Sequence, residues 1–84
     1  MNTNTAEVVK DKFEIGWMNL PAHAQTKLRD AIVKECGWKS LMTFYTKKKG
    51  TSKIGVLEIK VIEAEFKKYG INPWTGMPFF DENY

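Results

Sequence analysis

The 84-residue sequence has few of the side chains from which metal sites and disulfide frameworks are built. Cysteine and histidine occur once each, as Cys36 and His23, which excludes an intrachain disulfide and the usual zinc sites. No apolar run approaches the roughly 18 residues of a membrane span, and the polar residues 1–12 lack the apolar segment of a signal peptide. We therefore expect a cytoplasmic protein with no membrane partner and no cofactor.

Catalytic groupings are also missing from the sequence. No pair of nucleophile and base and no phosphate-loop glycine spacing is visible, and Glu63 and Glu65 lie two residues apart, on different sides of a helix. We therefore expect neither enzymatic activity nor a small-molecule substrate. Hydrophobic residues make up 43% of the chain and charged residues 27%, which predicts one globular domain. Its small core leaves room for a homodimer.

Positive charge is concentrated in the middle of the chain. Residues 27–68 carry eleven basic and five acidic side chains, whereas the two flanks have net charges of −1 and −2. This distribution is typical of an anion-binding surface, although a solvated lysine-rich turn has the same composition. Arg29 is the only arginine, so contacts to nucleic acid would rely on lysine, which favours phosphate attraction over base discrimination.

Periodicity and helix-terminating residues predict four helices, of which the first two precede Gly37. The first begins near Thr5 and ends before Pro21. The second begins at Pro21, ends at Cys36 and uses Gly37 as its left-handed stop. The apolar stripe of the first helix comprises Val9, Phe13 and Trp17.

The third and fourth predicted helices follow Trp38, which we expect to fill the gap between the second and third helices. The third covers residues 39–48 and is closed by Gly50. The fourth is capped by Thr51 or Ser52 and runs to Tyr69. The residues of the third helix expected to face the core are Leu41 and Phe44.

One alternative stays open for residues 54–61, where five strand-favouring side chains and Gly55 would suit a short strand. The unbroken helical period of residues 58–68 favours a helix. The sequence thus predicts an all-α fold, a compact four-helix domain over residues 1–72 with its core motif at 24–50. An irregular extension, 73–84, would dock on the domain or on a partner through Trp74, Phe79, Phe80 and Tyr84.

The segment LRDAIVKECGWKSLMTFYTKKKG, followed by an apolar helix that ends in KKYGIN, resembles the small Cro/CI-type (lambda-repressor-like) helix-turn-helix regulators. More closely, residues 24–72 are similar to short phage and mobile-element proteins with a GW..S..TFY..K..G signature. The resemblance implies a compact all-α DNA-binding domain that regulates transcription of a phage or mobile element. It matches Gly37 and Trp38 to the turn, Gly50 to the end of the recognition helix, and to that helix Ser40, Thr43, Phe44 and Tyr45.

The spacing departs from the usual form of this signature by one extra residue between Gly37 and Thr43. Absorbed within the helix, the extra residue rotates the recognition helix by about 100°; absorbed in the turn, it lengthens the turn. The resemblance turns Thr43 toward DNA and Phe44 toward the core. The rotation therefore decides which side chains read bases.

The predicted function is sequence-specific or semi-specific binding of double-stranded DNA, with the helix near residues 39–49 in the major groove. The side chains predicted to face bases or adjacent phosphates are Lys39, Ser40, Met42, Thr43, Tyr45 and Thr46. Those predicted to hold the phosphate backbone are Lys47, Lys48, Lys49, Thr51 and Lys53. The alternative is a protein-interaction adaptor or inhibitor module that uses the aromatic extension and the Trp17 face.

Overall fold

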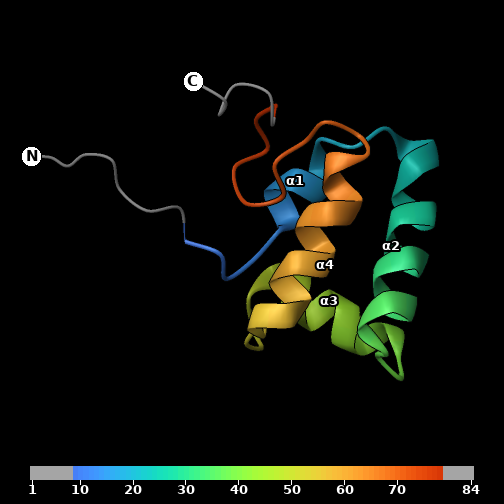
Figure 1. The fold of residues 1–84 in the computed structure, drawn as a ribbon, viewed down its shortest axis with the longest axis vertical. Coiled ribbons are helices and arrows are strands. Elements are labelled where there is room, and N and C mark those ends of the chain that lie inside the picture. Colours follow the sequence, from blue (N-terminus) through green and yellow to red (C-terminus); the bar gives the residue numbers. More distant parts are fainter. Residues whose placement is uncertain (1–8, 79–84) are drawn as a thin grey trace, which may run out of the picture.

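The computed structural model describes residues 9–78 of the chain. It contains four helices: α1 (Glu14–Met18), α2 (Ala22–Cys36), α3 (Leu41–Lys49) and α4 (Val56–Lys67). Figure 1 shows α2 and α4 side by side, with α3 crossing below them and α1 behind the upper part of α4. The prediction of an all-α fold is confirmed.

The first helix is much shorter than predicted. It begins at Glu14, residues 9–13 are not helical, and the predicted start at Thr5 lies outside the described residues. The reason is a tertiary contact: the amide of the fully buried Phe13 donates to the carbonyl of Lys48, 3.1 Å away, instead of to a helical carbonyl. Val9 is 69% exposed, so the predicted apolar stripe loses its first member.

The second helix agrees with the prediction to within one residue, because it begins at Ala22 instead of Pro21 and ends at Cys36. Pro21 stands at its N-terminal cap, and Gly37 ends it in the left-handed conformation with a φ of 71°. A Cβ added at Gly37 would have no atom of residues 9–78 within 4 Å. Only the positive φ therefore requires glycine at this position. The buried face of α2 consists of Ala24, Leu28 and Ile32.

The third helix is closed by Gly50, as predicted, but it begins at Leu41. Phe44 is fully buried, whereas Leu41 is 43% exposed and does not face the core as expected. Trp38 from the preceding turn packs on Phe44, with ring centroids 6.4 Å apart.

The fourth helix is capped differently from the prediction. Its N-cap is Gly55, and the carboxylate of Glu58 accepts the Gly55 amide at 2.9 Å, so neither Thr51 nor Ser52 has that role. The helix ends at Lys67, two residues before the predicted end. The alternative strand over residues 54–61 is wrong, because residues 56–61 belong to α4.

The start of the C-terminal extension belongs to the core. The ring of Trp74 packs edge-on against Phe13 with centroids 6.4 Å apart, and its Nε1 donates to Glu63 at 2.7 Å. The amide of Gly16 on α1 donates to the carbonyl of Pro73 at 3.2 Å. Residues 73 and 74 therefore hold α1 and α4 together, whereas the predicted docking residues Phe79, Phe80 and Tyr84 lie outside the described residues.

Candidate nucleic-acid interface

The turn between α2 and α3 is fixed by hydrogen bonds at both of its first two residues. The Gly37 amide donates to the carbonyl of Lys34 at 3.2 Å, and the Trp38 amide donates to that of Val33 at 3.0 Å. The indole of Trp38 is half-buried against the core, and its side-chain contacts are with Phe44 and Lys47 on α3 and with Glu58 on α4. The four residues 37–40 thus form a short, well-defined turn.

The three consecutive lysines at the end of α3 have different environments. Lys47 is held inward, because its Nζ donates to the Lys53 carbonyl at 2.6 Å and to Glu58 at 3.0 Å. Lys48 is nine-tenths buried, and only Lys49 is fully on the surface. The helical rotation of 100° per residue explains the difference, because Lys48 follows the buried Phe44 by four residues and shares its face. That spacing was the available sequence signal.

Glu58 connects the turn, α3 and α4. Its carboxylate accepts hydrogen bonds from Trp38 Nε1 at 2.7 Å, from Lys47 Nζ at 3.0 Å and from the Gly55 amide at 2.9 Å. Partial burial acts to raise the pKa of Glu58, but the hydrogen bonds from Gly55, Trp38 and Lys47 outweigh it, so the pKa lies below the ordinary 4.5. The sequence pattern gave no reason to single out this residue.

The hydroxyl groups at the end of α3 also form internal contacts. Thr46 Oγ1 donates to the carbonyl of Thr43 at 3.1 Å and lies 2.9 Å from Ser52 Oγ. Thr51 Oγ1 donates to the carbonyl of Thr46 at 3.0 Å. Thr43 and Thr46 are half-buried and not fully on the surface as predicted, and Ser52 of the loop after α3 contacts the Thr46 hydroxyl.

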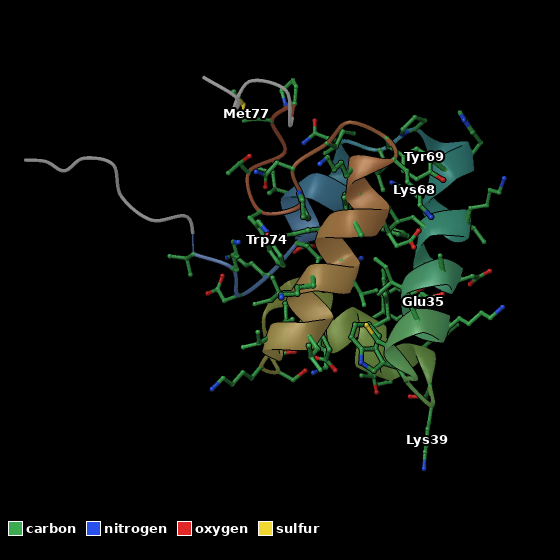
Figure 2. All side chains as sticks on the ribbon, in the orientation of Figure 1. Glu35, Lys39, Lys68, Tyr69, Trp74 and Met77 are labelled. Carbon is green, nitrogen blue, oxygen red and sulfur yellow. The ribbon has the colours of Figure 1, made fainter. Side chains whose placement is uncertain are left out.

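The exposed residues of the predicted site lie along α3 and at its two ends. Figure 2 shows Lys39 extending away from the body of the molecule, beyond the start of α3. Lys49 and Lys53 are exposed at the other end, and none of these three lysines has an ion-pair partner within residues 9–78. The other exposed members of the predicted site are Ser40, Met42 and Thr51.

Arg29 links α2 to α3. Its Nη1 donates to the hydroxyl of Tyr45 at 3.3 Å, and its Nε donates to Asp30 at 3.1 Å. These two hydrogen bonds raise the pKa of Arg29, and the bond to Tyr45 has the larger effect. Arg29 was not among the predicted site residues, although a helical projection places it on the same side of α2 as Val33 and Cys36, which lead into the turn.

Surface depressions lie beside the segment that leads into α1 and beside α1 itself. One, of about 370 Å³, lies between residues 10–11 and the loop 50–54. The other, of about 490 Å³, is lined by Trp74 and by the exposed apolar side chains of Ile15 and Met18 on α1, with Lys12 and Glu14 at its edge. The second depression gives α1 an apolar surface that the sequence analysis did not predict.

Comparisons with protein family models, with curated proteins and with solved structures gave no match for this chain. None of the helices in the described part of the chain is long and apolar enough to cross a membrane. Residues 9–78 also contain no group of three or more His, Cys, Asp or Glu side chains that could hold a metal ion.

Proposed function

We propose that this chain is a small helix-turn-helix protein that binds double-stranded DNA, with most of its affinity from phosphate contacts. The observation that carries the proposal is the placement of Lys39, Lys49 and Lys53, which are exposed, lack ion-pair partners in the described region and lie at the two ends of α3. An α-helix is about 10–12 Å in diameter with its side chains, so α3 can enter a major groove about 12 Å wide.

Base recognition by this surface would be modest. Met42 is 67% exposed on α3 and offers an apolar contact to a thymine methyl, and Ser40 is exposed just before the helix. The half-buried Thr43 and Thr46 are poorly placed to reach base edges. The proposal is therefore semi-specific binding, in which phosphate contacts position α3 and few side chains read the sequence. Transcriptional regulation of a phage or mobile element and a cytoplasmic location stay predictions.

The experiment that tests this function is a fluorescence-anisotropy titration of random-sequence duplex DNA at several salt concentrations. We expect the wild-type affinity to fall steeply with salt, and the triple variant K39A/K49A/K53A to reduce the slope of log K against log salt by about 2.7, roughly 0.9 for each phosphate contact. Absence of binding at low salt by the folded protein would refute the proposal.

A matched control separates local contacts from net charge. Lys34, Lys60 and Lys67 are also exposed and form no ion pair with any described residue, but they belong to α2 and α4 and not to α3 or its ends. The variant K34A/K60A/K67A removes the same charge and should keep most of the slope. Equal losses in the two triple variants would show non-specific attraction without a defined surface.

We also propose that the DNA-bound form is a homodimer, since one short helix rarely supplies enough affinity and half-sites are commonly doubled. The apolar side chains of Ile15 and Met18 around the 490 Å³ depression suit contact with a second copy. Met18 is 70% exposed, so M18K should leave the fold intact and make the protein monomeric in sedimentation. A wild-type monomer on DNA would refute this part of the proposal.

The same apolar surface favours the second candidate function, a protein-interaction module that uses α1 and the end of the chain. Removing residues 73–84 would not test it, because Pro73 and Trp74 are buried in the core. Removing only residues 79–84 leaves the described fold complete. If that truncation loses DNA binding at an unchanged melting temperature, residues 79–84 are needed for binding. If it keeps DNA binding, the result favours α3 as the binding element.

A further inference from the structure

Lys48 is a buried residue whose ammonium has no acidic partner among residues 9–78. It is 9% exposed, and its Nζ lies 5.1 Å from the ring centroids of both Trp17 and Tyr45. Its ammonium forms no hydrogen bond or ion pair in the described part of the chain. The faces of two aromatic rings attract the ammonium, but they do not use its N–H groups as a hydrogen-bond acceptor would. An anion beside Lys48 would accept these hydrogen bonds.

Tyr45 contacts two cations, Lys48 at its ring and Arg29 at its hydroxyl group. The guanidinium of Arg29 can only donate hydrogen bonds, so at 3.3 Å its Nη1 uses a lone pair of the Tyr45 hydroxyl and leaves the hydroxyl hydrogen available. Of the five N–H donors of Arg29, one is directed at Tyr45 and one at Asp30, so three are unused. Asp30 supplies a single carboxylate to this group and already pairs with Arg29 Nε.

The cluster of Lys48, Tyr45 and Arg29 therefore offers donors and almost no acceptors. Three N–H groups of Lys48, one O–H of Tyr45 and three N–H groups of Arg29 are available. Such an arrangement complements an oxyanion with several acceptor atoms, because charged donors to phosphate make the stronger class of hydrogen bonds. The pairing of an arginine fork with a lysine suits a phosphate group in particular.

We infer that Lys48, Tyr45 and Arg29 form a binding site for a phosphate group at the junction of α2 and α3. Tyr45 precedes the exposed Lys49 by four residues, so the two share a side of α3 and the site is continuous with the proposed DNA-facing surface. The assignment of the phosphate to a nucleic-acid backbone rests on the proposed function. Binding of a free phosphate does not, and the two sources are tested separately.

The first experiment measures inorganic phosphate binding by the full-length chain. Phosphate is titrated against chloride at equal ionic strength, and the melting temperature and the NMR shifts of residues 29, 45 and 48 are followed. We expect phosphate to raise the melting temperature and to shift these residues, since a ligand bound only by the folded state stabilises it. Shifts spread evenly over all lysines, or no difference between phosphate and chloride, would overturn the inference.

Two variants assign the binding to the cluster. K48M keeps an apolar stem against Trp17 and Tyr45 but removes the ammonium, and it should abolish the response to phosphate. Y45F keeps the ring and removes one donor, and it should weaken phosphate binding about tenfold. Because both changes leave the buried volume nearly unchanged, the melting temperature in chloride reports whether each variant folds.

Matched controls use the same substitutions elsewhere. Lys60 is exposed on α4, and Tyr69 follows α4 at the end of the molecule opposite Lys39 in Figure 2. K60M and Y69F should respond to phosphate like the wild type. An equal loss in K48M and K60M would show that net charge alone governs the response, and it would overturn the site.

Titrating K48M and Y45F with duplex DNA separates this inference from the proposed function. Weaker DNA binding in both variants, with a normal K60M, assigns the site to a backbone phosphate. If phosphate binds at the cluster but the wild type binds no DNA, the site stands and the proposed function fails. If DNA binding is strong and both variants match the wild type in phosphate and DNA titrations, the inference fails and the function stands.

Discussion

Nε1 of Trp38 donates a hydrogen bond to Glu58 at 2.7 Å, and this bond joins the turn between α2 and α3 to the first turn of α4. The two residues are twenty positions apart, so the bond sets the position of α3 relative to the rest of the molecule. The same carboxylate holds Lys47 and the N-terminal amide of α4. One glutamate therefore fixes the end of the proposed helix-turn-helix unit.

Trp38→Phe tests this link directly. Phenylalanine keeps an aromatic ring against Phe44 but cannot donate to Glu58, so we expect a loss of about 1–3 kcal/mol in the free energy of unfolding. Urea denaturation followed by circular dichroism measures the change. In the double-mutant cycle with E58A, which removes the accepting oxygens, a coupling energy near zero would contradict a direct bond.

Glu58→Gln should give the protein a different dependence of stability on pH. Because the folded-state pKa of Glu58 is lowered, its contribution is present above the unfolded pKa and is lost as pH falls through the folded value. The wild type should therefore exceed E58Q in stability near neutral pH, and the difference should shrink below about pH 4. Melting temperatures across this range check the sign. A difference that grows on acidification would show that burial dominates instead.

Lys47→Ala should lower stability without changing the salt dependence of DNA binding. The Lys47 ammonium is bound to Glu58 and to the Lys53 carbonyl and its side chain is 15% exposed, so it has little freedom to reach a phosphate. We expect a loss of about 1–2 kcal/mol in unfolding free energy, whereas the K49A slope should fall by about 0.9. A K47A slope as low as that of K49A would place Lys47 in the interface.

Gly16→Ala should destabilise the protein strongly for its size. A Cβ at Gly16 would lie 2.5 Å from the Cα of Pro73, so α1 and the chain at residues 73–74 would have to separate. We expect a cost of about 1–3 kcal/mol, measured by thermal denaturation. Gly55→Ala is the control, because its Cβ would meet only the side chain of Glu58, at 3.5 Å. Equal melting temperatures in the two variants would contradict the close packing at Gly16.

The sequence alone determined the local features of this protein. The all-α class, the bounds of α2, and the stops at Gly37 and Gly50 follow from helical periodicity and from the left-handed conformation that glycine adopts freely. These signals act over a few neighbouring residues, so they survive whatever the rest of the chain does. The buried position of Phe44 was likewise predicted from the local sequence pattern.

Only the tertiary structure decided the start of α1, the cap of α4 and the environments of the lysines. Phe13 bonds to Lys48 and Trp38 to Glu58, and neither partner lies within one helical turn along the chain. The charge pattern of the sequence does not distinguish the three lysines at 47–49. In the structure Lys47 pairs with Glu58, Lys48 is buried against aromatic rings and Lys49 is exposed. The physical reason is that a lysine's long side chain takes its partner from other elements, which local sequence patterns do not specify.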